Sequence, residues 1–271
     1  MTPGRIKLLD GVIFEIIPMK NAFEKAVDLP AGALVSVTAS AAKGMEATVE
    51  LSEQLAARGY RVIPHLSARL TKSQIELEGH VERLTAAGIT RAFVVGGDAD
   101  DPGEFFDAMA LIRGLEKIQH PFTEVGVTGY PEGHPVISDG QLEAALLEKQ
   151  PHASYIATQM CFDATKIGNW LSARRAAGAH LPVIVGIPGA IETVKLMTIG
   201  ARIGVGSSLK YLAKNRRSVA KLLRPGTFTP DDLIDDLGQI AEDPATNLVG
   251  LHLFTFNQVE GTLEWLQGVE R

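Results

Sequence analysis

The sequence predicts an α/β chain folded as a closed (β/α)8 TIM barrel, and three observations lead to that prediction. Eight short runs of strand-forming residues recur along the chain. Most of them are continuously apolar, as expected of parallel strands that are covered on both faces. Helix-like stretches follow most of the runs, which favours parallel strands joined by right-handed crossovers. Eight such repeats in 271 residues fit a closed barrel better than an open sheet.

The predicted strands are 12–17, 34–38, 61–64, 91–95, 124–128, 154–159, 182–187 and 248–254. The predicted helices between and after them are 44–58, 71–87, 101–117, 141–149, 164–177 and 257–268, with an extra helix at 207–223 and another at 229–242 before the eighth strand. Gly59 and Gly88 follow two of these helices and predict left-handed C-terminal caps. The four residues from Thr71 to Gln74 predict a capping box at a helix start. The alternative, an open doubly wound sheet, usually has a glycine-rich loop after its first strand, where this chain has Pro18.

Composition narrows the class of protein further. Lys plus Arg is 26 and Asp plus Glu is 32, so the net charge is 26 − 32 = −6, which argues against nucleic acid and anionic membranes as partners. The single cysteine, Cys161, excludes a disulfide framework and a cysteine-rich zinc site. No apolar segment is long enough to span a bilayer, and no linker divides the chain. We therefore expect a cytoplasmic protein whose residues 1–271 form one catalytic domain, without an appended regulatory domain. The sequence does not indicate its oligomeric state.

Chemistry in a barrel gathers at the carboxyl ends of the strands, so the polar residues there are the candidates for function. Glu15 lies inside the first apolar run, where burial raises the pKa of a carboxyl group and suits a general acid. A buried ion pair is the alternative for Glu15. Thr38 ends the second run and His65 follows the third. Gly97 permits close approach of a planar ligand, and Asp98 is placed to bind a ring edge or stabilise a developing cation.

The later runs end in aromatic, amide and acidic groups. Tyr130 and His134 belong to one tight loop after the fifth run, in which Glu132 alternates with His134 as metal ligands would, but no third ligand is nearby. Gln159 has both a donor and an acceptor for an amide-containing heterocycle. Cys161 is interpreted as buried and inert, and Asp163 as the cap of the next helix. We find no convincing metal site, no Ser-His-Asp triad and no Walker phosphate loop. The set suits a flat, nitrogen-rich ligand.

Read in order, these strand ends resemble methylenetetrahydrofolate reductase along almost the whole chain. The matching pieces are Phe14-Glu15 with Pro18, Ser36-Val37-Thr38, Pro64-His65-Leu66, Gly97-Asp98, Tyr130-Pro131-Glu132-Gly133-His134-Pro135, Thr158-Gln159 with Phe162-Asp163, Ile187-Pro188-Gly189, and Thr255 with Asn257. The resemblance implies a (β/α)8 barrel enzyme of one-carbon metabolism and methionine biosynthesis. Such an enzyme reduces 5,10-methylenetetrahydrofolate to 5-methyltetrahydrofolate with NADH or NADPH.

The resemblance also assigns roles to residues. It makes Glu15 the general acid and Asp98 the group that recognises the pterin ring and favours the developing cation. It places Gln159, Phe256 and Gln258 at the substrate, with Gln159 hydrogen-bonded to the pterin. The cofactor site it implies is lined by Thr38, His65, Gly97, Tyr130 and His134.

Usual members of the family bind FAD, and this chain departs from them where cations face the flavin phosphates. Gly96 stands where relatives have a basic residue, and Glu148 stands where they have a lysine, although Lys149 is adjacent. Gln258 occupies a position where an arginine is common. Without those cations a pyrophosphate loses charge-assisted hydrogen bonds. We expect direct hydride transfer from the nicotinamide to folate without tightly bound FAD. The alternatives are an ordinary FAD-dependent reductase, a deazaflavin as donor, and a folate-binding protein without activity.

Two minor hypotheses concern anions. The segment 204–208 has backbone N–H groups that could bind a phosphate of the dinucleotide, with a serine-capped turn as the equal alternative. Three cations, Arg69, Lys210 and Lys214, could meet the glutamate tail of a folate, although surface charge is the safer interpretation.

Overall fold

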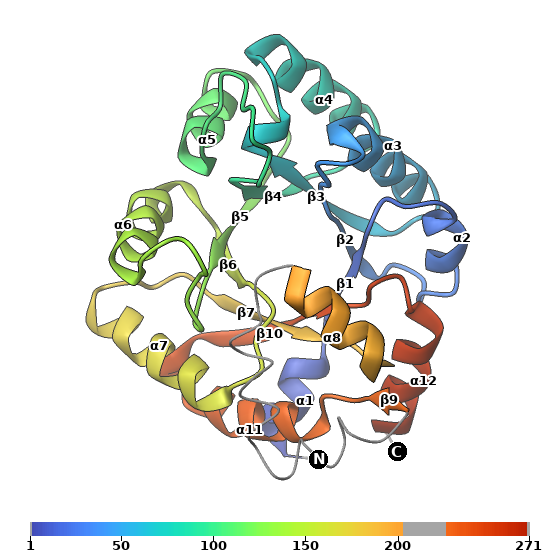
Figure 1. The fold of residues 1–271 in the computed structure, drawn as a ribbon, viewed down its shortest axis with the longest axis vertical. Helices are drawn as coiled ribbons and strands as arrows, with labels where there is room; N and C mark the ends of the chain where they lie inside the picture. The colour runs from blue at the N-terminus through green and yellow to red at the C-terminus, as the bar shows by residue number, and fades with distance from the viewer. Residues whose placement is uncertain (1, 203–225, 270–271) are drawn as a thin grey trace. The chain divides into compact units, whose positions relative to one another are not determined.

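The computed structural model of the chain describes residues 2–202 and 226–269. Eight strands form a closed barrel and are hydrogen-bonded in the order β1-β10-β7-β6-β5-β4-β3-β2, which confirms the predicted fold (Figure 1). These strands are β1 (Ile13–Ile16), β2 (Leu34–Val37), β3 (Arg61–Ser67), β4 (Arg91–Val95), β5 (Glu124–Gly129), β6 (Tyr155–Thr158), β7 (Val183–Pro188) and β10 (Leu248–Phe254).

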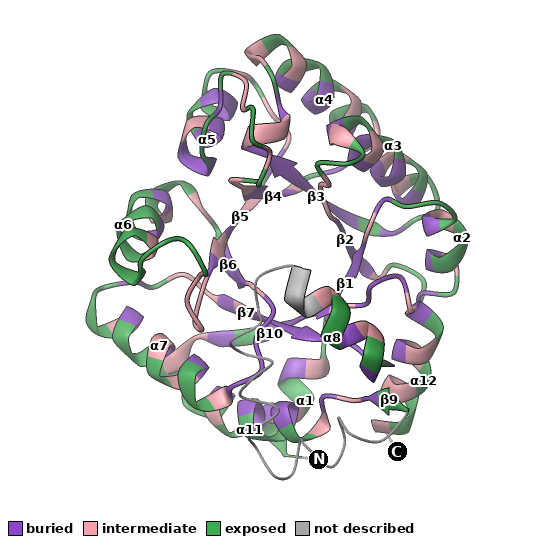
Figure 2. Cartoon of the chain, in the orientation of Figure 1, coloured by how far each residue is buried: buried purple, intermediate pink, exposed green. Residues whose placement is uncertain are grey.

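The strands carry much of the core, because they are buried on both faces. Every residue of β1, β2 and β6 is buried, and much of the barrel strands is purple in Figure 2, although half of β5 is of intermediate exposure. This burial explains why most strand sequences are continuously apolar rather than alternating. The exceptions are polar residues inside strands, above all Glu15 of β1, His65 of β3 and His252 of β10.

The chain forms two compact units. The N-terminal unit consists of Ile13–Thr128 and Ala145–Tyr155, and the C-terminal unit of Met1–Val12, Gly129–Ala144 and Ile156–Arg271. Residues 13–128 of the N-terminal unit contain the helices α2 (Ala22–Ala26), α3 (Gly44–Ala57), α4 (Gln74–Ala86) and α5 (Ala108–Glu116). A 3-10 turn, Ala68–Leu70, lies between α3 and α4. Helix α3 packs on β2 and β3, and α4 packs between α3 and α5.

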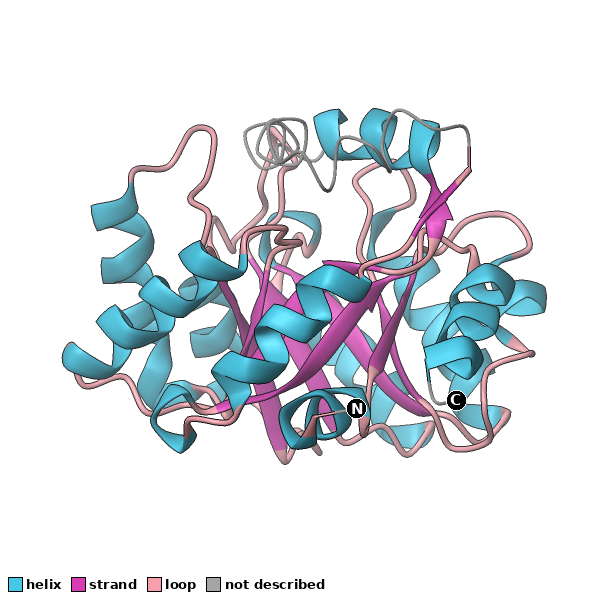
Figure 3. Cartoon of the chain, turned by 90° about the horizontal axis from the view of Figure 1, so that it is seen from below, coloured by secondary structure: helices cyan, strands magenta, loops and turns pink. Residues whose placement is uncertain are grey.

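In the C-terminal unit, β7 pairs with β10, and several helices pack around this pair. They are α1 (Pro3–Leu9), α7 (Ala164–Ala176), α8 (Thr193–Arg202), α11 (Asp231–Ala241) and α12 (Val259–Val269), while α6 (Asp139–Lys149) runs from this unit into the other. Helix α1 lies against α11 and β10. Figure 3 shows the strands in magenta and the helices in cyan. A small antiparallel pair, β8 (Ile191–Glu192) and β9 (Thr227–Phe228), contacts α8. No described helix has the length and apolar character needed to cross a bilayer.

Several predicted boundaries were wrong. Helix α4 begins at Gln74 rather than Thr71, because Thr71 Oγ1 donates to the carbonyl oxygen of Ser67 at 3.0 Å and does not act as the cap. Ser73 is the N-cap instead, since its side chain accepts from the Glu76 N–H, while the Glu76 carboxylate accepts from the N–H of Lys72, the residue before the cap. Helix α5 begins at Ala108, not at residue 101, with Asp107 as its cap.

The region before the last barrel strand was predicted in part. Helix α11 confirms the helix predicted at 229–242, and α8 supplies a helix between the seventh and eighth barrel strands. The predicted helix at 207–223 and the 204–208 segment lie outside the described residues, as do Lys210 and Lys214. Helices α1, α2 and α8 and the β8–β9 pair were not predicted.

Candidate active site

Glu15 is the buried acid of the N-terminal unit. It lies in β1, opposite Ser36 of β2, and its exposed fraction is 5%. Burial raises the pKa of Glu15 from 4.5 to about 8, so the carboxyl group is mostly protonated at neutral pH. A carboxylate oxygen of Glu15 lies within 4.8 Å of a ring nitrogen of His65. A carboxyl group that keeps its proton at neutral pH is able to act as a general acid.

His65 and Thr38 surround this acid from the two following strands. His65 is 7% exposed, and its ring packs against that of Phe93 of β4 at 4.8 Å between ring centroids. Thr38 directly follows β2, and its N–H donates to the carbonyl oxygen of Ile16 at 3.0 Å. Glu15, Thr38 and His65 therefore lie in or directly after three neighbouring parallel strands of the N-terminal unit, β1, β2 and β3.

The loop after β4 carries Gly97 and Asp98. Gly97 has a φ of +82°, a conformation that favours glycine. A methyl group at this position would also come within 2.2 Å of Ser67 Oγ. Asp98 itself is exposed. Its carboxylate is therefore accessible to a ligand, in contrast with that of Glu15.

Glu132 has a structural role in the C-terminal unit that the sequence did not indicate. Its Oε1 accepts hydrogen bonds from the N–H groups of Phe162 at 2.6 Å and Asp163 at 2.7 Å. Asp163 in turn caps α7 by accepting from Thr165 and Lys166, as predicted. Two carboxylates thus satisfy four N–H groups at the start of α7.

His134 and Tyr130 lie in the same loop as Glu132. The Nδ1 atom of His134 faces the N–H groups of Val136 at 3.3 Å and Ile137 at 3.2 Å, so it acts as an acceptor. The ring of Tyr130 meets that of His134 edge-on, with 5.5 Å between the ring centroids. Since Glu132 Oε1 and His134 Nδ1 both bind backbone N–H groups, their spacing reflects loop architecture.

Gln159 directly follows β6 and is held in one orientation. Its Oε1 accepts from the N–H of Met160 at 2.8 Å. This bond directs the amide and leaves Nε2 as the donor for a ligand. Cys161 is buried, and burial raises the pKa of its thiol well above the ordinary value. The interpretation of Cys161 as an inert side chain agrees with this environment.

The segment after β10 combines unusual backbone with buried rings. Phe256 and Asn257 both have positive φ angles, of 49° and 59°, which is uncommon for residues other than glycine. Phe256 is buried, and its ring lies 6.3 Å from that of Phe254. The side chain of Gln258 accepts from the N–H of Glu192 at 3.2 Å. Gln258 therefore ties this segment to β8.

His252 was missed by the sequence analysis. It lies in β10 with an exposed fraction of 3%, and its ring stacks on Phe254. Burial lowers the pKa of His252 from 6.5 to about 4, so the ring is neutral at physiological pH. A polar residue inside an apolar strand is the signal that identified Glu15, and it was equally present at His252.

Glu148 and Lys149, at and beside a position where the resemblance implies a flavin-binding lysine, are both engaged within the protein. Glu148 pairs with Arg113 of α5 at 2.8 Å. Lys149 is 9% exposed, and burial lowers the pKa of its ammonium group. Arg69 donates to backbone carbonyls of the loop after β4, which disfavours the role of folate-tail ligand considered for it.

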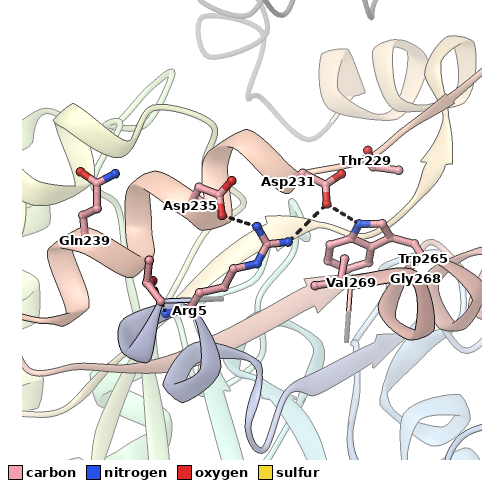
Figure 4. Close-up of a pocket in the computed structure, with 9 residues that line it drawn as sticks. Arg5, Thr229, Asp231, Asp235, Gln239, Trp265, Gly268 and Val269 are labelled. Carbon is pink, nitrogen blue, oxygen red and sulfur yellow. Dashed lines mark hydrogen bonds and ion pairs between the residues drawn. The ribbon is translucent and has the colours of Figure 1, made fainter. Parts of the chain in front are cut away.

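A pocket of about 870 Å³ lies in the C-terminal unit and contains none of the predicted site residues (Figure 4). Arg5 of α1 crosses it to pair with Asp235 and, at 3.5 Å, with Asp231 of α11. Trp265 of α12 donates to Asp231 at 3.1 Å. These bonds connect α1, α11 and α12, so the residues of the pocket wall hold the three helices together.

Known proteins resemble this chain in sequence and in fold. A stretch of 89 residues is 37% identical to Methylenetetrahydrofolate reductase 2 of Saccharomyces cerevisiae and covers 31% of this chain and 15% of the yeast protein. A stretch of 115 residues is 26% identical to a probable methylenetetrahydrofolate reductase (NADPH) of Caenorhabditis elegans and covers 40% of this chain and 17% of that protein. The chain thus matches a small part of these relatives' length.

Fold similarity extends to unrelated sequences. A putative phosphonomutase from Burkholderia cenocepacia J2315 superposes with a TM-score of 0.52 at 11% identity, covering 96% of this chain and 92% of that one. At this identity the likeness shows the barrel fold alone.

A match to a family model covers a longer part of this chain than the two relatives do. The model of the family described as methylenetetrahydrofolate reductase matches residues 19–205, which is more than half of the 271 residues. This range contains His65, Asp98 and Gln159, whereas Glu15, Phe256 and Gln258 lie outside it. The chain belongs to the methylenetetrahydrofolate reductase family.

Proposed function

We propose that this protein reduces 5,10-methylenetetrahydrofolate to 5-methyltetrahydrofolate, with NADH or NADPH as the direct hydride donor and without tightly bound FAD. The observation that carries the proposal is the buried Glu15, whose pKa of about 8 keeps it protonated at neutral pH. Binding alone needs no buried acid, whereas opening the methylene bridge needs a proton donor.

In the proposed reaction the Glu15 carboxyl group gives its proton to N10 of the substrate. The bond between N10 and the methylene carbon breaks, and its electron pair stays on N10. The remaining iminium carbon, bonded to N5, then accepts a hydride from the nicotinamide. This forms the methyl group and oxidises the dinucleotide.

Other residues have proposed roles in binding. Asp98 hydrogen-bonds the pterin edge and favours the positive charge that develops at N5, since its carboxylate is exposed to a ligand. Gln159 donates Nε2–H to the pterin, because Oε1 is already held by the Met160 N–H. The family resemblance also assigns Phe256 and Gln258 to the substrate. It assigns the nicotinamide to Thr38, His65, Gly97, Tyr130 and His134.

The side chains at two positions that the resemblance assigns to cations, and at the residue beside one of them, do not fit the phosphates of FAD. Gly96 has no side chain, Glu148 is negative and paired with Arg113, and the Lys149 ammonium is largely buried. A pyrophosphate placed at these positions would gain no exposed cation from them and would meet the carboxylate of Glu148.

The first experiment records the visible spectrum of the purified protein and measures NADH- and NADPH-dependent reduction with and without added FAD. Turnover by a colourless protein, unchanged by FAD, supports the proposal. A yellow protein, or turnover that depends on FAD, contradicts the flavin-free mechanism. Absence of turnover under both conditions, with folate binding intact, indicates a folate-binding protein instead.

The second experiment tests Glu15. The variant Glu15→Gln is expected to lose turnover while calorimetry shows unchanged affinity for 5-methyltetrahydrofolate. Unchanged turnover would remove the proposed role of Glu15 as the acid.

A further inference from the structure

The loop that carries Asp98 is attached to the segment following β3. The loop comprises residues 96–107, between β4 and α5. The segment comprises residues 67–74 and includes the 3-10 turn Ala68–Leu70. Both belong to the N-terminal unit, and the strands that precede them pair in parallel, with Ser67 opposite Val95.

Arg69 makes several of the hydrogen bonds between the segment and the loop. Its Nε donates to the carbonyl oxygen of Ala99 at 2.5 Å, Nη2 to that of Asp100 at 3.1 Å, and Nη1 to that of Phe106 at 3.3 Å. The backbone N–H of Arg69 also donates to the carbonyl oxygen of Gly96 at 3.0 Å. One residue therefore binds both ends of the loop.

A second set of bonds lies beside Lys72. The Glu104 N–H donates to the carbonyl oxygen of Lys72 at 3.0 Å, and the Glu104 carboxylate accepts from the Gln74 N–H at 3.0 Å. The Lys72 ammonium group donates to the carbonyl oxygen of Asp101. A methyl group at Gly103 would come within 2.1 Å of the Lys72 carbonyl oxygen, so the two backbones are in close contact.

These contacts leave Asp98 at the exposed turn of an otherwise fastened loop. On its N-terminal side, Gly97 packs against the buried Ser67. On its C-terminal side, Ala99 and Asp100 are bound by the guanidinium group of Arg69. The side chain of Asp98 is exposed, so its position depends on how firmly its backbone is held.

We propose that Arg69 is a positioning residue that fixes the loop 96–107 so that the Asp98 carboxylate is held ready for the pterin ring. This inference rests on the proposed function, in which Asp98 binds that ring. The planar guanidinium group presents several donors in one rigid arrangement, which the point charge of a lysine cannot reproduce.

The test is a double-mutant cycle with the variants Arg69→Met, Asp98→Asn and the pair together. Arg69→Met is expected to lower kcat/KM for methylenetetrahydrofolate by about 100-fold, the cost of misplacing a reacting group by roughly 1 Å. KM for the nicotinamide should stay within about twofold. In the Asp98→Asn background the same Arg69 substitution should have almost no further effect, because its action passes through Asp98.

A matched control is available in β3, the strand that precedes the turn of Arg69. Arg61, at the opposite end of β3, donates through Nε to the carbonyl oxygen of Gly32 at 3.0 Å. Arg61→Met also removes an arginine that binds a loop carbonyl, and it should leave kcat/KM unchanged. Hydrogen exchange should rise across residues 97–107 in Arg69→Met and stay unchanged there in Arg61→Met.

If Arg69→Met does not fold, the cycle is run with Arg69→Lys, for which an intermediate loss of about tenfold is expected. Additive effects of the Arg69 and Asp98 substitutions, or an unchanged kcat/KM in a folded Arg69 variant, would overturn the inference while leaving the proposed function intact.

If the wild-type protein has no reductase activity, the proposed function fails, and the same cycle is run on calorimetric binding of 5-methyltetrahydrofolate. Coupled losses of affinity together with raised exchange then support the positioning role. Independent losses, or none, reject it.

Discussion

The carboxylate of Glu132 accepts a hydrogen bond from the backbone N–H of Asp163 at 2.7 Å, and the same oxygen accepts from Phe162. Glu132 belongs to the loop after β5, and Asp163 caps the helix that follows β6. Neighbouring loops of the C-terminal unit are thereby joined through one side chain.

Replacing Glu132 by alanine is expected to destabilise the fold by about 1–3 kcal/mol, because two N–H groups lose their acceptor. Urea unfolding measures the loss. Glu132→Gln keeps an acceptor oxygen and should lose less. Glu50→Ala, at an exposed position of α3, should change the free energy of unfolding by less than about 0.5 kcal/mol. An equal loss in the free energy of unfolding for Glu132→Ala and Glu50→Ala would contradict the conclusion that Glu132 joins the two loops.

The raised pKa of Glu15 predicts how the free energy of unfolding changes with pH. Its pKa is about 8 in the folded protein, against an ordinary value of 4.5. Between these values the folded state keeps a proton that the unfolded state has released. The contribution of this group is therefore full below 4.5 and is lost as the pH rises through 8.

The variant Glu15→Gln has no proton to lose, so its stability relative to wild type should increase as the pH rises through that window. Each unit of pKa difference corresponds to about 1.4 kcal/mol. Urea unfolding of both proteins across the window measures the difference, in which the other titrating groups largely cancel. A difference that is constant with pH would show that the pKa of Glu15 is not raised.

Two glycines in helices should respond in opposite directions to alanine. A methyl group at Gly4 of α1 would come within 1.9 Å of the carbonyl oxygen of Gly238 in α11, so Gly4→Ala forces two helices apart. We expect a loss of about 1–3 kcal/mol in the free energy of unfolding. Gly79 of α4 has open space around it, and Gly79→Ala should stabilise by up to about 1 kcal/mol, since alanine favours the helix. Thermal unfolding of both variants checks the pair, and a gain for Gly4→Ala would disprove the close crossing.

Gln159 should contribute to binding through its donor. The variant Gln159→Glu replaces Nε2–H₂ by a carboxylate oxygen, so affinity for 5-methyltetrahydrofolate should fall by about tenfold or more, as expected for the loss of one hydrogen bond to an unpaired group. Isothermal titration calorimetry gives the dissociation constant. Gln239→Glu, on the exposed side of α11, adds the same charge and should leave the affinity unchanged. Equal weakening by both substitutions would point to net charge rather than to the donor.

Much of the fold could be predicted because a buried strand is marked by a continuous run of apolar residues in the sequence. Continuous apolar runs gave all eight barrel strands with boundaries within about three residues of those observed. Helices α1 and α2 escaped prediction because they are short and their stability comes from packing, as between Gly4 and Gly238. The start of α4 was misplaced because Thr71 and Ser73 are both possible caps, and the Thr71 hydroxyl donates to the Ser67 carbonyl of the preceding turn instead.

By itself, the sequence determined the barrel, the buried acid at Glu15 and the family resemblance, because each depends on residue type at a fixed position along a strand. The tertiary structure alone decided what the polar groups bind. It directed Glu132 to backbone N–H groups, Glu148 to Arg113, and Arg69 to the loop of Asp98. Hydrogen bonds between residues far apart in the chain leave no local pattern, since either partner could equally face solvent or a ligand.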